Sequence, residues 1–264
     1  MTLLQASADP AHWTLAQPLG GDTATPLNLR RRLDLVEALL PPLAGLRVLD
    51  VGCGGGEYVR ALLARGADAH GLEPGGEKLA SARRLPAGAA RRIAAGDVGC
   101  APFASHSFDA LLANEMLEHV PDDASALREM WRLLRPGGRL VLLSPNRLHP
   151  FETHGVFARR SGRRLSHALP GVPWIPLPLG RRFLRYWARN YWPWQLRRLV
   201  GEAGFRTLRT GYLWQTFENI SGRQPGWVAA LRPLLQGAAA IAERAPGLRA
   251  LGASQWLLAI KPRR

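Results

Sequence analysis

The chain has 264 residues, of which 47% are hydrophobic and 21% charged, a composition typical of a folded globular protein with one large domain. Its two cysteines, Cys53 and Cys100, are too few for a disulfide framework or a cysteine-rich zinc site, and we expect no bound metal. No segment approaches the roughly 18 apolar residues of a membrane-spanning helix, and the first residues lack the basic-then-apolar order of a signal peptide, so we expect a cytoplasmic protein.

The net charge of +15 is concentrated in the second half of the chain. Residues 1–146 carry 15 Arg and Lys against 16 Asp and Glu, a net charge of −1. Residues 147–209 carry 13 against 2, a net charge of +11, and residues 210–264 carry 7 against 2, a net charge of +5. Because 33 of the 35 basic residues are Arg, a bias that a GC-rich genome produces, the charge is weak evidence for a nucleic-acid partner.

Residues 46–146 alternate short apolar runs with helical periodicity, the pattern of a parallel sheet covered by helices. Before them, residues 1–45 form an expected N-terminal lid or packing segment that contains an amphipathic helix. The expected elements are helices at 29–40, 57–65, 77–84 and from Asp122 or Asp123 to 136–138, and strands at 47–51, 69–72, 93–97, 108–113 and 139–144. Right-handed crossovers then predict an α/β fold with a doubly wound, mostly parallel seven-stranded sheet.

Beyond residue 146 the pattern changes. Residues 147–192 are rich in arginine, proline and aromatic residues and show no strand pattern, which predicts a cap inserted after the fifth strand. Residues 193–264 complete the sheet with a helix and two strands, expected at 193–203, 205–209 and 255–261. They also contain a partly helical insertion at 211–253, broken at Pro233.

A glycine-rich loop follows the first expected strand and begins a helix. Glycines in this position let a ligand approach the backbone closely. However, Glu57 stands where a dinucleotide fingerprint has its third glycine, and an acid in the first helical turn would repel a pyrophosphate. Asp50, just before Gly52 and Gly54, indicates the same preference for a ligand that is cationic rather than phosphorylated.

Two further acids stand at the ends of the next two strands. Glu73, 21 residues after Gly52, is placed to accept hydrogen bonds from both hydroxyls of a ribose. Asp97, at the end of the third strand, is placed to accept one from an adenine amine. A glycine loop surrounded by acids suits an adenosine with a positive charge, and S-adenosylmethionine fits that description.

Two stretches, VLDVGCGGGEYVRALLARGADAHGLEP and GDVGCAPFASHSFDALLANEMLEHVPDDASALREMWRLLRPGGRLVLLSPN, carry a family resemblance. They resemble the class I S-adenosylmethionine-dependent methyltransferases, in the branch that includes methyltransferases of ubiquinone and menaquinone biosynthesis. The resemblance covers about residues 46–146 and implies S-adenosylmethionine as the cofactor. The residues that it implies bind the cofactor are Asp50, Gly52, Gly54, Glu73, Pro74, Asp97, Val98, Asn114, Glu115 and Met116.

Histidines near the ligand edge of the sheet are candidates for the removal of a proton from the acceptor. His119 follows the fourth strand, and His154 lies just beyond the fifth. For both, a structural role is about as well supported. His149, Glu152 and His154 could also hold a metal, but without a further ligand type we do not expect a metal site there.

The cap allows three interpretations. Its aromatic residues can cover the cofactor pocket, they can form an acceptor tunnel whose basic rim meets anionic lipid at the inner face of the membrane, or they can bind single-stranded nucleic acid. We favour methyl transfer to a small or lipid-like acceptor, most often at oxygen. A nucleic-acid methyltransferase is less favoured, because Asn114-Glu115-Met116 is not the turn that holds an adenine amine. A non-catalytic S-adenosylmethionine-binding subunit is the other alternative.

Overall fold

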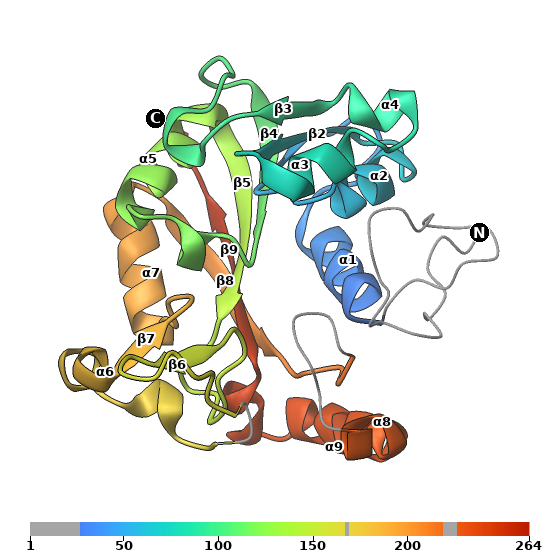
Figure 1. Ribbon diagram of the computed structural model, residues 1–264. Coiled ribbons are helices and arrows are strands. Elements are labelled where there is room, and N and C mark those ends of the chain that lie inside the picture. Colours follow the sequence, from blue (N-terminus) through green and yellow to red (C-terminus); the bar gives the residue numbers. More distant parts are fainter. Residues whose placement is uncertain (1–26, 167–168, 219–225, 264) are drawn as a thin grey trace.

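The computed structural model describes residues 27–166, 169–218 and 226–263. A seven-stranded sheet in the order β3-β2-β1-β4-β5-β9-β8 runs through the molecule (Figure 1). The strands β1 to β5 pair in parallel, whereas β9 runs antiparallel to both of its neighbours. The strands of this sheet are β1 (Arg47–Val51), β2 (Asp68–Glu73), β3 (Ile93–Ala95), β4 (Phe108–Asn114), β5 (Leu134–Pro145), β8 (Arg206–Leu213) and β9 (Ser254–Ile260).

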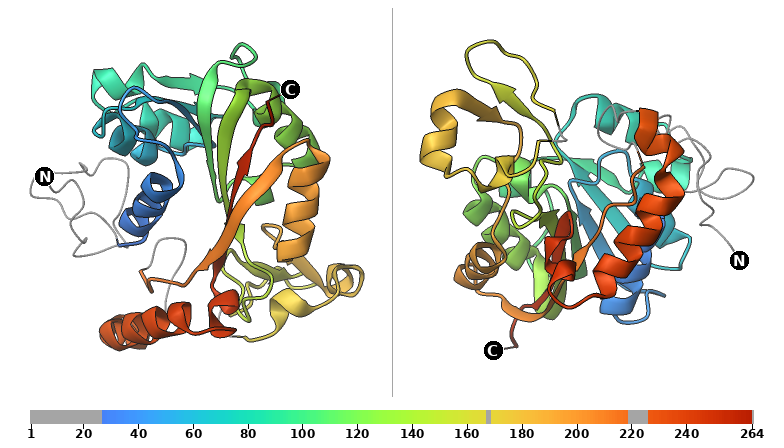
Figure 2. Two further views of the ribbon diagram at one scale, coloured as in Figure 1. Left: turned by 180° about the vertical axis from the view of Figure 1, so that it is seen from behind. Right: turned by 90° about the horizontal axis from the view of Figure 1, so that it is seen from below.

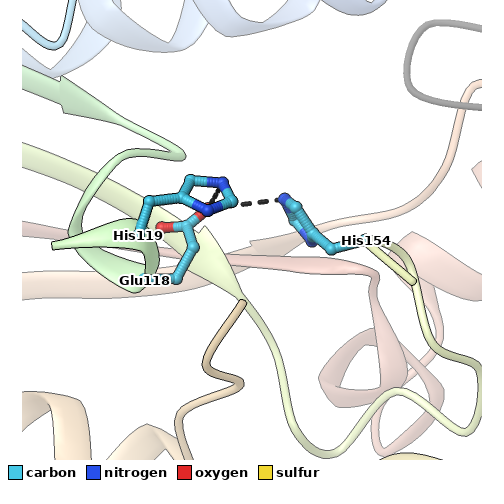
Figure 3. A group of neighbouring side chains, drawn as sticks. All are labelled: Glu118, His119 and His154. Carbon is cyan, nitrogen blue, oxygen red and sulfur yellow. Dashed lines mark ion pairs between the residues drawn. The ribbon is translucent and has the colours of Figure 1, made fainter. Parts of the chain in front are cut away.

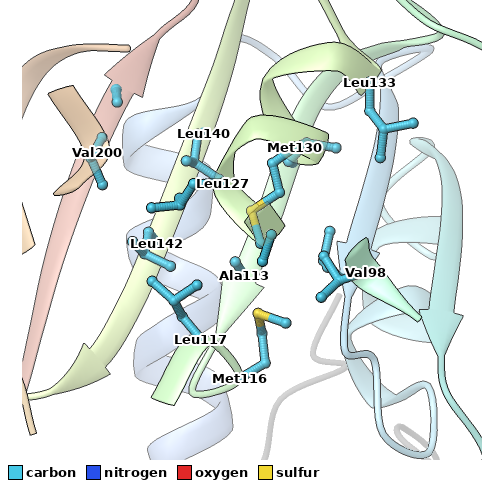
Figure 4. Close-up of a cluster of buried hydrophobic side chains, with 14 of the residues drawn as sticks. Val98, Ala113, Met116, Leu117, Leu127, Met130, Leu133, Leu140, Leu142 and Val200 are labelled. Carbon is cyan, nitrogen blue, oxygen red and sulfur yellow. The ribbon is translucent and has the colours of Figure 1, made fainter. Parts of the chain in front are cut away.

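Helices cover both faces of the sheet, as the sequence predicts for a doubly wound fold. One face packs against α1 (Leu27–Leu39) and α2 (Glu57–Leu63), and the other against α5 (Asp123–Leu133) and α7 (Pro193–Glu202). Leu127 and Met130 of α5 lie against the strands on that second face (Figure 4). The fold class and the mostly parallel seven-stranded sheet are therefore confirmed.

Local interactions explain where the helix α5 begins and ends. The carboxylate of Asp122 accepts a hydrogen bond from the Ser125 N–H and so caps α5, as expected. The helix ends earlier than expected, at Leu133, because β5 already pairs at Leu134 and resumes after an irregularity at Arg139. Two short helices complete this half of the fold, α3 (Gly76–Ala82) and α4 (Ala87–Ala90), of which only α3 was predicted.

The cap contains strands that the sequence did not predict. The strands β6 (Val156–Ala158) and β7 (Leu184–Tyr186) form a separate antiparallel pair, joined through α6 (Leu177–Phe183). Each strand has only three residues and its partner lies far along the chain, so no local alternation signals them. The cap lies beyond the carboxyl end of β5 (Figures 1 and 2).

The carboxyl-terminal part departs from the expected boundaries in one respect. β8 continues to Leu213, so the helical insertion begins later than residue 211. Two helices follow, α8 (Gly226–Ala230) and α9 (Arg232–Arg244), which meet at Leu231, close to the expected break at Pro233. Residues 1–26 of the expected N-terminal segment and 219–225 of this insertion lie outside the described residues. No helix in the described ranges is both long and apolar enough to cross a bilayer.

Candidate functional site

The glycine loop between β1 and α2 has the backbone that its sequence demands. Gly52, Gly54 and Gly56 have φ angles of 70°, 57° and 84°, a region that favours glycine. The N–H groups of Gly52 and Cys53 donate to the Leu72 carbonyl, which ties the loop to β2. A Cβ on Gly52 would lie 2.7 Å from the Met116 Cβ, whereas a Cβ on Gly54 would meet nothing within 4 Å. The loop is therefore packed at Gly52 and open at Gly54.

Three acids surround this open glycine. Asp50 is 1% exposed, and its Oδ2 has no hydrogen-bond partner among the described residues. Burial, with Glu57 and Glu73 adding to it, raises the pKa of Asp50 well above its usual value. Burial also raises the pKa of Glu57 to about 7. A cation beside the loop would relieve these costs, so the residues present fit a sulfonium.

Glu73 links the end of β2 to the loop. Its Oε2 accepts a hydrogen bond of 2.9 Å from the Gly54 N–H, and burial raises the pKa of its carboxyl group. This places a carboxylate at the edge of the open loop, where the sequence predicts a ribose. Pro74, which follows it, is exposed. Glu57 was not predicted as a site residue, because the sequence argument used it only against a pyrophosphate. Its position in the first turn of α2, directly after the glycine loop, is the signal that could have identified it.

Asp97 and Val98 lie after β3 at the same edge of the sheet. Asp97 is exposed and its Oδ1 accepts a hydrogen bond of 2.7 Å from the Gly99 N–H, which caps the 3-10 turn Val98–Cys100. Val98 is buried. One carboxylate oxygen of Asp97 thus orders the turn. An adenine contact from this segment remains a prediction.

The segment after β4 is held by an arginine that sequence reasoning missed. Arg32 of α1 is buried and donates to the side chains of Asn114, Glu115 and Ser254. Its bonds to Glu115 Oε1 and Ser254 Oγ are 3.0 Å and 2.9 Å long. Burial raises the pKa of Glu115, but Arg32 and then His154 outweigh it, and the pKa lies below its usual value.

Arg32 could have been found from helical spacing. It lies three residues after Leu29 and four before Val36, on the face of α1 that is buried against the sheet. The side chains of Asn114 and Glu115 therefore accept hydrogen bonds from Arg32, and Met116 packs against Gly52. Their role in cofactor binding stays a prediction.

The two histidines predicted near the acceptor come together, although 35 positions separate them. The rings of His119 and His154 lie 5.3 Å apart, centre to centre, and both face the carboxylate of Glu118 (Figure 3). Burial lowers the pKa of His119 to about 4, and the neighbouring His154 makes the next largest contribution in the same direction. The imidazole of His119 is therefore neutral at neutral pH. Burial and then Glu115 raise the pKa of Glu118 well above its usual value.

His149 and Glu152 do not join this pair in one cluster. His149 is buried, and its Nδ1 lies 2.7 Å from the Leu251 carbonyl. Glu152 accepts hydrogen bonds from the His154 N–H and from Asn190 Nδ2, at 3.1 Å and 2.8 Å. Both residues thus anchor the loop that carries His154.

A cavity of about 970 Å³ separates the cap from the core. Glu118 and His119 line it from the core side, and Tyr186 and Trp187 from the cap side. Its basic lining residues are Arg147, Arg159, Arg181, Arg185 and Arg189. The cavity is therefore large and lined by both cationic and apolar groups.

Comparison with known proteins agrees with this geometry. Residues 49–142 match a protein family described as a methyltransferase domain. This part of the chain is therefore similar to methyltransferase domains. The resemblance to class I S-adenosylmethionine-dependent methyltransferases is thereby confirmed for the core.

One similar curated protein is a ubiquinone biosynthesis O-methyltransferase from Pseudomonas aeruginosa. It is 44% identical over 110 residues, which cover 40% of this chain and 47% of that protein. The chain thus spans about half the length of the curated relatives that it matches. The similarity to these relatives therefore covers less than half of this chain.

Solved structures show the fold over a longer span. A methyltransferase from Mesorhizobium loti has a TM-score of 0.57 at 18% identity and covers 86% of this chain and 96% of its own. The [4+2]-cyclase SpnF has a TM-score of 0.55 at 22% identity and covers 98% of this chain and 88% of its own. Because the second protein is described as a cyclase, the fold alone does not determine the reaction.

Proposed function

We propose that this protein transfers the methyl group of S-adenosylmethionine to an oxygen of a small or lipid-like acceptor. The observation that carries the proposal is the acidic glycine loop. In a methyltransferase domain, Asp50, Glu57 and Glu73 surround the open position at Gly54, a setting that suits a cationic cofactor. The relatives named as O-methyltransferases support oxygen as the methylated atom.

The cofactor supplies an electrophilic methyl group, which the acceptor oxygen takes in line as the bond from carbon to sulfur breaks. The chain has to align the two molecules, exclude water and receive the hydroxyl proton. We infer that the cavity beneath the cap holds the acceptor, because Glu118 and His119 line the side nearest the core. A neutral imidazole at His119 can accept a hydrogen bond from the acceptor hydroxyl.

Replacement of either histidine should reduce turnover more than cofactor binding. We expect His119→Gln and His154→Gln to lower kcat by about 100-fold or more, since the proton of the acceptor is no longer handled. The dissociation constant of the cofactor should change by less than about twofold. The measurement is transfer of a labelled methyl group to a panel of phenols, catechols, sugars and hydroxylated lipids.

His70→Gln is the matched control, because His70 lies within β2 and contacts Asp68 and Arg92 instead of the cavity. Cofactor binding without methyl transfer to any class of acceptor would contradict the enzymatic proposal and favour a non-catalytic binding subunit. Unchanged turnover in a histidine variant would remove that residue from the site.

We also propose that the cap contacts an anionic membrane surface while the acceptor enters. The side chains of Phe183 and Trp187 are 65% and 66% exposed, beside the exposed Arg181, Arg182 and Arg185. Apolar groups flanked by arginines suit a bilayer interface with anionic headgroups. Vesicles with anionic lipid should retain the protein, and purely zwitterionic vesicles should not.

The double variant Phe183→Ser with Trp187→Ser should lose most of this retention. Leu234→Ser is the control, because Leu234 is 72% exposed but belongs to α9, outside the cap. Equal retention of the parent and the double variant would contradict membrane contact by the cap.

A further inference from the structure

Glu118 and His119, which line the cavity from the core side, form a cluster with His154 (Figure 3). One carboxylate oxygen and one ring nitrogen from each histidine lie within 4.8 Å of one another. Glu118 Oε1 is 3.5 Å from His154 Nε2 and 3.9 Å from His119 Nε2. All three groups are ligand types that divalent transition metals take in proteins.

The carboxylate of Glu118 is the unusual member of this cluster. Its side chain is 0% exposed, and among the described residues its oxygens meet only its own backbone N–H and the carboxyl group of Glu115, neither in good hydrogen-bond geometry, besides the two imidazoles. A buried carboxylate with such poor hydrogen bonds is costly, and native structures keep one where an ion or a function requires it. The two imidazoles approach it at 3.5 Å and 3.9 Å, which is longer than a typical hydrogen bond and leaves room between the three groups.

The loop that carries His154 fixes the direction of its ring. The Oγ1 of Thr153 lies 3.1 Å from His154 Nδ1, and the His154 N–H donates to Glu152. Asn190 in turn donates to Glu152. Histidines that bind a metal through one ring nitrogen usually have a hydrogen-bond partner on the other, which fixes the direction of the ring. Thr153 occupies that place beside His154.

We propose that Glu118, His119 and His154 bind a divalent transition-metal ion of the zinc class. Bonds of about 2.0–2.1 Å to a tetrahedral ion place its ligand atoms about 3.4 Å apart, so small side-chain rotations would close the cluster. The sequence expectation of no metal considered His149 and Glu152 with His154. The structure instead brings His154 to two residues that follow β4.

Three protein ligands leave at least one position of the ion open, and Glu118 and His119 direct it to the cavity. This role, unlike metal binding itself, rests on the proposed function. A hydroxyl of the acceptor bound at that position would lose its proton more readily and become the nucleophile. His119 and His154 would then act through the ion, and the proton would leave to solvent through the cavity.

Metal binding can be tested without cofactor or acceptor. The full chain, without affinity tags and stripped with a chelator, is titrated calorimetrically with Zn²⁺, and Co²⁺ serves as a spectroscopic probe. We expect one equivalent to bind, and the Co²⁺ form to show the visible bands of a four- or five-coordinate site. His119→Gln and His154→Gln should each weaken Zn²⁺ binding by at least about tenfold.

His70→Gln controls for the general loss of a histidine and should bind Zn²⁺ as the parent does. Glu118→Gln should abolish binding, but because Glu118 is buried, the half-exposed His119 provides the variant least prone to misfolding. Absence of Zn²⁺ binding in the parent, or parental affinity in both histidine variants with intact circular dichroism, would overturn the proposal. Neither result depends on whether methyl transfer is found.

Discussion

Arg32→Ala is expected to lower the free energy of unfolding by about 3–5 kcal/mol, the range for removing one partner of a buried ion pair. The side chain of Arg32 connects α1 to Asn114 and Glu115 after β4 and to Ser254 at the start of β9. Its removal leaves the carboxylate of Glu115, whose side chain is 17% exposed, without its main cation. Urea denaturation followed by tryptophan fluorescence measures the change.

Arg31→Ala provides the matched control for this variant. Arg31 is the preceding residue of the same helix and pairs with Glu243, but both side chains are about one quarter exposed. A partly solvated pair of this kind contributes about 0–1 kcal/mol. If the two variants lost equal stability, the buried contacts of Arg32 would contribute no more to the free energy of unfolding than a partly exposed ion pair does, which would contradict this prediction.

The sheet could be predicted because its signals are local. The strand Arg47–Val51 was predicted with its observed bounds, since a short apolar run ends at a glycine loop. A helix cap was predicted at Asp122 or Asp123, because both precede an amphipathic run, and the structure shows that Asp122 is the cap. In contrast, β6 and β7 have three residues each, and only their pairing across the cap, from Val156 with Tyr186 to Ala158 with Leu184, defines them.

In the candidate site, too, the residues placed by local signals could be predicted, whereas the contacts between distant segments could not. Glu73 could be placed because a parallel sheet brings the carboxyl ends of its strands to one edge. The contact between His119 and His154 could not, since the loop that returns His154 depends on the anchors of Glu152 and His149. Arg32 was missed for a related reason: apart from Asn28 in the same helix, its side-chain partners lie 82 or more positions away.

Glu73→Ala is expected to weaken the binding of S-adenosylmethionine by about 1–3 kcal/mol, which is about 5- to 150-fold, because hydrogen bonds from the ribose to a buried acid are lost. Part of the loss is structural, since Glu73 also accepts from the Gly54 N–H. Glu73→Gln keeps an acceptor for Gly54, so it should bind more tightly than the alanine variant and less tightly than the parent. Calorimetry with each purified variant gives the dissociation constants.

S-adenosylhomocysteine separates a ribose contact from a charge contact. It has the same ribose but lacks the sulfonium charge, so Glu73→Ala should weaken both ligands equally, whereas Asp50→Asn should weaken the sulfonium more. Glu77→Gln is the control, because Glu77 lies in the first turn of α3 and is exposed. Unchanged affinity in Glu73→Ala, or a loss confined to the sulfonium, would contradict the ribose assignment, because hydroxyl recognition cannot depend on a charge on sulfur.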